Sequence, residues 1–201
     1  MDVSLGCIVE GKGEVSAVRI LLRRVAAGID PSISVRPVIA MHARSALLRG
    51  GELERAVQAL SYRLTRNSGM LILLDSDDEQ ACVLGPALLR RANSARPDVR
   101  IRVVLATREY EAWFLAAAES LAGKSGLRSD FTPPADPEKI RGAKEYLARN
   151  MKSGGTYSPT RHQPALTEQF DLAAARSAKS FQKFCRDLQS LLAEISSDPH
   201  C

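Results

Sequence analysis

The stretch MLILLDSDDE at residues 70–79 joins the most apolar run of the chain directly to its densest group of acids. The apolar residues 70–74 predict a strand buried on both faces, as in a parallel sheet covered by helices on each side. Asp75 and Asp77 follow at the end of this strand. Since ligands bind at the carboxyl ends of the strands in such sheets, the stretch predicts both a fold and the place of a site.

The segments around this strand alternate between short apolar runs and amphipathic stretches. We expect further strands at 3–9, 33–40 and 100–106, and helices at 14–28, 53–64, 79–95 and 109–122. Pro37 favours an edge position for its strand, because proline donates no ladder hydrogen bond. The order predicts an α/β fold, with a doubly wound, mainly parallel sheet and helices on both faces.

Glycine and proline become frequent after residue 122, which indicates a boundary. We therefore predict an α/β domain over residues 1–122 and a helical C-terminal extension over 123–201. The extension should contain helices at 138–151 and 168–195 and a loop at 153–166. The apolar stripe through Phe181 and Phe184 favours packing on the sheet domain over binding a partner.

The composition is that of an ordinary globular protein, with 45% hydrophobic and 25% charged residues in 201. The chain has no apolar run of about 18 residues and begins without a signal-peptide pattern, so we expect a cytoplasmic location and no membrane contact. The net charge of +5 permits a polyanionic partner.

The cysteines and histidines are scattered along the chain, which argues against a zinc site. The expected state of the thiols is reduced, with Cys7 and Cys82 in apolar surroundings. The residues concerned are Cys7, Cys82, Cys185, Cys201, His42, His162 and His200.

A second group of acids, EGKGE at residues 10–14, follows the first predicted strand. If the two acidic strands are neighbours, Glu10 meets Asp75 and Asp77 at one edge of the sheet. Crowded carboxylates repel one another and raise each other's pKa, and a hard cation such as Mg²⁺ removes that cost. Aspartates two residues apart on a strand point to the same side, which suits shared coordination.

The acids at 10–14 and 75–79 also allow other interpretations. Residues 75–79 also suit the start of the following helix, where Asp77 or Asp78 would act as a cap. The segment 10–14 lacks the spacing of a P-loop. A response-regulator receiver is disfavoured, because a single glutamate stands where an acidic pair is required.

At these residues the chain resembles the Toprim superfamily, shared by topoisomerases, bacterial primases and OLD-type nucleases. EGKGE matches its Glu-Gly-x-x-Glu after strand one, and Asp75-Ser76-Asp77 matches its Asp-x-Asp after strand three. The blocks REYEAWF at 108–114 and SFQKF at 180–184 are similar to a family of small standalone Toprim-like proteins of unknown function (domain-of-unknown-function family 4276), often encoded beside an ATPase. The chain departs from that family at Lys12-Gly13, where a threonine commonly precedes the second glutamate.

The resemblance implies that Glu10 is a general acid or base and that Asp75 and Asp77 bind Mg²⁺ or Mn²⁺. It makes Glu14, Asp78 and Glu111 candidates for a second ion or for orientation. Phosphate contacts are expected from basic side chains and from amides near glycine, at Gly11, Lys12, Gly13, Arg108 and Arg161.

The resemblance implies metal-dependent phosphodiester chemistry on nucleic acid, with cleavage as the leading reaction and DNA favoured over RNA. An ATPase partner, in defence or repair, is also expected, and a homodimer is left open. A topoisomerase or a primase would need further domains that this length does not hold. The alternative is a non-catalytic, metal-binding Toprim-like subunit of an ATPase complex.

Overall fold

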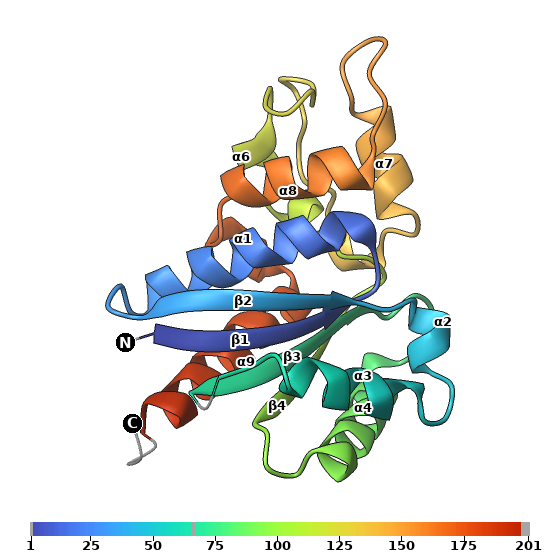
Figure 1. Cartoon of the computed structure of the whole chain (residues 1–201). Coiled ribbons are helices and arrows are strands. Elements are labelled where there is room, and N and C mark those ends of the chain that lie inside the picture. The colour runs from blue at the N-terminus through green and yellow to red at the C-terminus, as the bar shows by residue number, and fades with distance from the viewer. Residues whose placement is uncertain (1, 66, 198–201) are drawn as a thin grey trace.

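A computed structural model describes residues 2–65 and 67–197 and shows a sheet with helices on both faces (Figure 1). The strands are all parallel, in the order β2-β1-β3-β4. They are β1 (Asp2–Val9), β2 (Ser34–Met41), β3 (Ser68–Asp75) and β4 (Ile101–Ala106). Pro37 lies on the edge strand β2, as expected. The α/β prediction is confirmed, and the fold is consistent with a Toprim-like doubly wound arrangement.

Nine α-helices and two 3-10 turns lie in the described residues. They are α1 (Lys12–Ile29), α2 (Arg44–Leu47), α3 (Glu52–Ser61), α4 (Ala81–Ala95), α5 (Ala112–Ala116), α6 (Ala118–Leu121), η1 (Pro137–Lys139), α7 (Ala143–Arg149), α8 (Pro159–Gln169), η2 (Ala174–Ser177) and α9 (Lys179–Ser196). None of these helices has the length and apolar character needed to cross a membrane.

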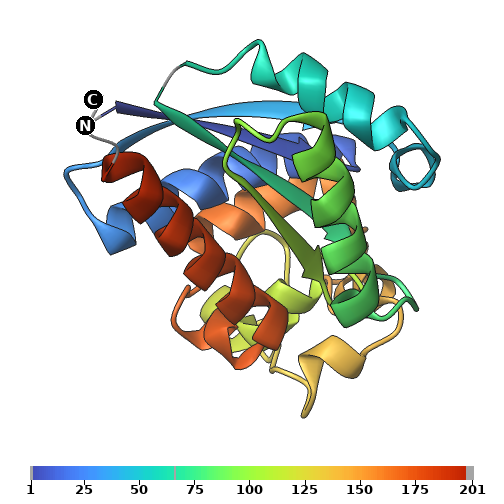
Figure 2. The same cartoon turned by 90° about the horizontal axis from the view of Figure 1, so that it is seen from below.

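The central strand β3 is buried on both faces, as its uninterrupted apolar run predicted. Leu71 and Leu73 belong to the core that includes α1 and α9, while Met70, Ile72 and Leu74 belong to the core under α3 and α4. The alternation follows from the period of two residues in a strand. Figure 2 shows α9 and α4 on opposite sides of the sheet.

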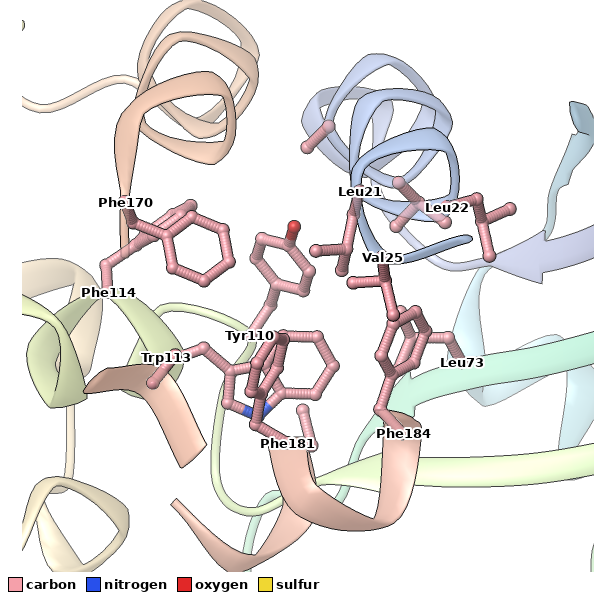
Figure 3. Packing of buried hydrophobic residues seen from close by; sticks show 14 of the residues in the cluster. Leu21, Leu22, Val25, Leu73, Tyr110, Trp113, Phe114, Phe170, Phe181 and Phe184 are labelled. Carbon is pink, nitrogen blue, oxygen red and sulfur yellow. The ribbon is translucent and has the colours of Figure 1, made fainter. Parts of the chain in front are cut away.

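The C-terminal segments pack on the sheet through a cluster of aromatic rings (Figure 3). The Trp113 ring lies 5.1 Å from that of Phe181 and 5.5 Å from that of Phe184, and its Nε1 donates to Ser180 Oγ at 2.8 Å. Helix α8 packs along α1, where Arg24 donates to the carbonyl of Thr167 at 2.6 Å. The prediction that the phenylalanine stripe faces the sheet domain is confirmed.

Several element boundaries differ from those expected. The predicted loop at 153–166 is wrong in its second half, because α8 begins at Pro159. Proline suits the first turn of a helix, where its missing N–H costs nothing. The predicted helix at 168–195 begins only at Lys179, after the turn η2. The predicted helix at 109–122 is split into α5 and α6.

The cysteines are reduced where the structure describes them. Cys7 and Cys185 are buried, whereas Cys82 is exposed on α4. Cys82 nevertheless lines a cavity whose other residues are mostly apolar, so its surroundings are as expected although its thiol is not in the core. Residues His200 and Cys201 lie outside the described part of the chain.

Candidate metal centre

The first side chain of the site follows β1 directly. Glu10 is the residue after Val9, the last residue of the strand, and Glu14 lies in the first turn of α1. The Glu14 carboxylate folds back on the turn, where its Oε2 accepts the backbone N–H of Glu10 at 3.2 Å. A Cβ on Gly11 would lie 2.9 Å from Glu14 Oε1, so the turn places this carboxylate against the backbone.

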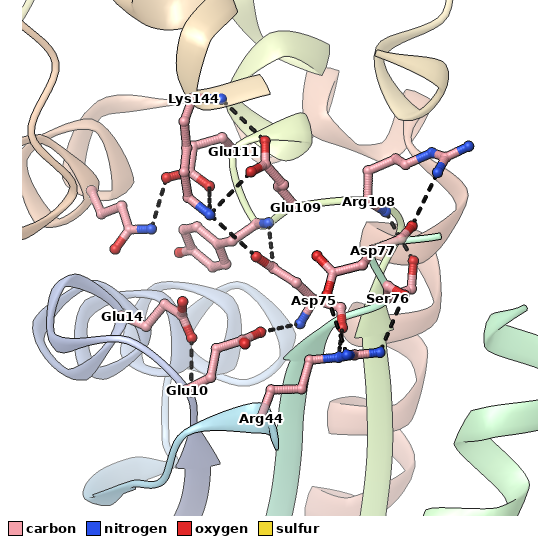
Figure 4. Close-up of polar contacts among 12 residues, drawn as sticks. Glu10, Glu14, Arg44, Asp75, Ser76, Asp77, Arg108, Glu109, Glu111 and Lys144 are labelled. Carbon is pink, nitrogen blue, oxygen red and sulfur yellow. Dashed lines mark hydrogen bonds and ion pairs between the residues drawn. The ribbon is translucent and has the colours of Figure 1, made fainter. Parts of the chain in front are cut away.

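The second strand end brings Asp75 to the same place, because β3 lies beside β1. Glu10 Oε1 accepts the backbone N–H of Asp75 at 2.6 Å, and Asp75 Oδ1 accepts that of Tyr110 at 2.7 Å (Figure 4). One carboxylate oxygen each from Glu10, Glu14 and Asp75 lies within 4.8 Å of the others. The convergence expected from neighbouring strand ends is therefore present.

Burial and mutual repulsion make these carboxylates difficult to ionise. Burial raises the pKa of Glu14 to about 7, and the charge of Glu10 adds to the effect. Burial likewise raises the pKa of Glu10, and it raises that of Asp75 well above its ordinary value. A cation bound among oxygen ligands would lower this cost, and oxygen is the ligand that Mg²⁺ prefers.

Asp77 does not join the three carboxylates. Its backbone is left-handed, with φ of 50°, and its side chain is 59% exposed. Its Oδ2 lies 3.3 Å from Nη1 of Arg44, whose Nε donates to the carbonyl of Asp75 at 3.0 Å. A metal-binding role for Asp77 therefore stays a prediction.

Asp78 is tied to two arginines at the rim of the site. It forms ion pairs with Arg108 and, at 2.9 Å, with Arg141. Helix α4 begins at Ala81 after Gln80, without a side-chain hydrogen bond at its cap. The alternative that Asp77 or Asp78 caps this helix is therefore wrong.

Glu111 is buried completely and lies on the far side of Asp75 from Glu10 (Figure 4). Its Oε1 accepts hydrogen bonds from Tyr157 Oη and from Gln163 Nε2, both at 2.9 Å. Its Oε2 is buried without a hydrogen bond and lies 3.8 Å from Lys144 Nζ. Burial raises the pKa of Glu111, although the charge of Lys144 opposes that change.

The predicted phosphate contacts fall in different places. Lys12 is exposed, whereas Gly13 is covered, since a Cβ there would lie 2.1 Å from Gln163 Oε1. Arg108 is engaged by Asp78. Arg161 lines a surface cavity of about 480 Å³ together with Lys152, His162 and residues of the glycine-containing loop 153–156.

Several residues of the centre carried no signal in the sequence. Arg44 reaches the acids from the segment between two predicted elements, and three residues of the predicted extension reach them as well, namely Lys144, Tyr157 and Gln163. Their side chains arrive through tertiary contacts, so no local pattern marks them. The sequence Ser158-Pro159 did hold a helix-start signal that would have placed Gln163 on a helix.

Comparisons with known proteins give one result. No curated protein and no solved structure matches the chain significantly. A family described as a domain of unknown function (DUF4276) matches residues 9–189, which includes every acid of the centre. The chain therefore belongs to this DUF4276 family.

Proposed function

We propose that the protein is a Mg²⁺- or Mn²⁺-dependent enzyme that cleaves phosphodiester bonds in nucleic acid. The observation that carries the proposal is the meeting of Glu10, Glu14 and Asp75 at two neighbouring strand ends. Their raised pKa values mean that negative charge at this place is only partly compensated within the protein. The resemblance of EGKGE and DSD to Toprim motifs supports the reaction class.

The donors fit a hard divalent cation, since the group offers carboxylate oxygens only. Asp75 and Glu14 are the ligands that we assign, and Glu111, with one buried oxygen left without a hydrogen bond, is the candidate for a second ion. A bound ion would supply charge stabilisation to a phosphoryl oxygen.

Glu10 is the residue that we assign to proton transfer. Its pKa is raised by burial, which moves a carboxyl towards the range where it exchanges protons near neutral pH. The backbone N–H of Asp75 holds Glu10 Oε1 at 2.6 Å, so the orientation of the carboxyl is fixed. We assign the other oxygen to accept a proton from an attacking water.

A nucleic-acid strand also needs cationic contacts away from the reacting phosphate. The cavity around Arg161 and Lys152 provides them, and no acidic side chain lines it among the described residues. Arginine and backbone amides of a glycine-containing loop are suited to phosphate. We assign this cavity to a flanking phosphate, with DNA as the preferred substrate.

The alternative is a metal-binding subunit without catalysis, acting with an ATPase. The observation in its favour is that two further aspartates near the centre form ion pairs instead of lying with Asp75. Asp77 pairs with Arg44, and Asp78 pairs with Arg108 and Arg141. A centre with three close carboxylates is sufficient for one ion, while two-metal cleavage needs further ligands.

The test is to compare the wild type with Glu10→Gln and Asp75→Asn. Mn²⁺ binding is measured by calorimetry, and cleavage of plasmid DNA and of RNA is followed with Mg²⁺ or Mn²⁺. Glu168→Gln, on an exposed position of α8, is the matched control. Cleavage that depends on Glu10 and Asp75 supports the enzyme. Cleavage that survives both substitutions contradicts the site, and Mn²⁺ binding without cleavage favours the subunit.

A further inference from the structure

A lysine of the C-terminal part of the chain reaches into the acid centre. Lys144 is the second residue of α7, and its Nζ lies 3.5 Å from Asp75 Oδ2, 3.2 Å from Glu109 Oε1 and 3.8 Å from Glu111 Oε2 (Figure 4). A single ammonium thus contacts three carboxylates, which are Asp75, assigned above to the metal, Glu111, the candidate for a second ion, and Glu109.

The charges around Lys144 hold it in the protonated form. Burial alone would lower its pKa, but Glu111, Asp75 and Glu109 together raise the pKa above its ordinary value. The ammonium therefore partly compensates the carboxylates in the metal-free protein. A divalent cation bound at Asp75 would lie close to this positive charge, and the two would repel each other.

The backbone of Lys144 is fixed by a hydrogen bond, whereas its side chain is partly exposed. Its backbone N–H donates to Glu109 Oε2 at 3.1 Å, which fixes the start of α7. The side chain is 34% exposed and has a flexible stem of four carbons, so the ammonium is able to swing towards solvent while the helix stays in place.

We propose that Lys144 is the internal counter-ion of the metal-free centre and that it turns to a phosphate group of the substrate when a divalent cation binds. The inference rests on the proposed function for the metal and the phosphodiester, and it adds an order of events. The cation replaces the ammonium as the partner of the carboxylates. The released ammonium then donates hydrogen bonds to a phosphate group, so binding of the metal strengthens binding of the phosphate and the reverse.

The first experiment measures Mn²⁺ affinity by calorimetry in the wild type and in Lys144→Met. We expect Lys144→Met to bind Mn²⁺ about three- to tenfold more tightly, because a competing charge is removed. Lys144→Arg keeps the charge and should stay within about twofold of the wild type. Lys124→Met removes an exposed lysine in the turn after α6 and is the matched control.

The second experiment measures binding of a fluorescent phosphorothioate-linked DNA oligonucleotide by anisotropy, without and with saturating Mn²⁺. In the wild type, Mn²⁺ should raise the affinity for the oligonucleotide about tenfold or more. In Lys144→Met the increase should be about threefold or less, because the coupling between metal and phosphate that Lys144 provides is lost. Lys144→Gln replaces Lys144→Met in both experiments if the methionine variant does not fold.

The outcomes separate the two proposals. If neither the wild type nor Lys144→Met binds Mn²⁺, both the metal centre and the role of Lys144 are overturned. If both bind it with the same affinity, or if Mn²⁺ strengthens oligonucleotide binding equally in both, the role of Lys144 is overturned while the proposed function stands.

Discussion

The raised pKa of Glu14 predicts that this carboxyl group destabilises the metal-free protein more at neutral pH than in mild acid. Glu14 is 5% exposed, and burial together with Glu10 raises its pKa from 4.5 to about 7. A carboxyl whose pKa is higher in the folded than in the unfolded state binds its proton more tightly when folded. Its contribution to stability is therefore complete below about pH 4.5 and is lost as the pH rises through about 7.

The size of the effect follows from the same values. At 1.36 kcal/mol per pKa unit, ionisation of Glu14 lowers the free energy of unfolding by about 3 kcal/mol at high pH. A decrease of about 2 kcal/mol falls between pH 5 and 7.5. Glu14→Gln removes the titration and keeps an oxygen that accepts the Glu10 N–H. The variant should therefore be more stable than the wild type at pH 7.5 and much closer to it at pH 5.

The assay is urea unfolding followed by circular dichroism at several pH values from 5 to 7.5, with a chelator present. The quantity of interest is the difference in free energy of unfolding between Glu14→Gln and the wild type at each pH. Glu168→Gln, the same change at an exposed position of α8, should show no pH-dependent difference. The reasoning is refuted if Glu14→Gln and the wild type change in parallel with pH, or if the variant is the less stable protein at pH 7.5.

Three further substitutions, with Gly28→Ala as the control for the first, test the packing, each by urea unfolding. Gly13→Ala should destabilise by about 1–3 kcal/mol, because its Cβ would lie 2.1 Å from Gln163 Oε1; Gly28→Ala, in open space on the same helix, should be neutral or stabilising by up to about 1 kcal/mol. Trp113→Ala should cost about 3–5 kcal/mol, since the ring is fully buried between α5 and α9, and a loss below about 1 kcal/mol would contradict that packing. Arg91→Ala should cost about 1–3 kcal/mol, because its guanidinium binds three backbone carbonyls and a carboxylate; an unchanged midpoint would show that these bonds add nothing.

The sheet was predictable because its strands are short apolar runs with clear ends. The run at 70–74 marked the central strand β3, and Pro37 marked the edge strand β2. The C-terminal part was less predictable, since α8 contains Pro164 and follows a glycine-containing loop, features that favour a loop when only local propensity is considered. Tertiary contacts with α1 stabilise this helix instead.

The acids were predictable for a similar reason. Glu10 follows β1 and Asp75 is the last residue of β3, and two neighbouring parallel strands place their ends together. The spacing of Asp75 and Asp77 was a weaker guide, because the strand ends at Asp75 and the left-handed backbone at Asp77 turns the second carboxylate towards Arg44. The period of two holds only while the chain remains a strand.

The centre depends on residues from both sides of position 122. The sheet supplies Asp75 and, through the turn after β4, Glu111, while the C-terminal part supplies the groups that compensate Glu111, namely Tyr157, Gln163 and Lys144. Without them, a carboxylate at 0% exposure would face neither a donor nor a cation, which is among the costliest states for a buried charge. The acidic chemistry at the strand ends and the packing of α7 and α8 are therefore linked, and a change in one is expected to alter the other.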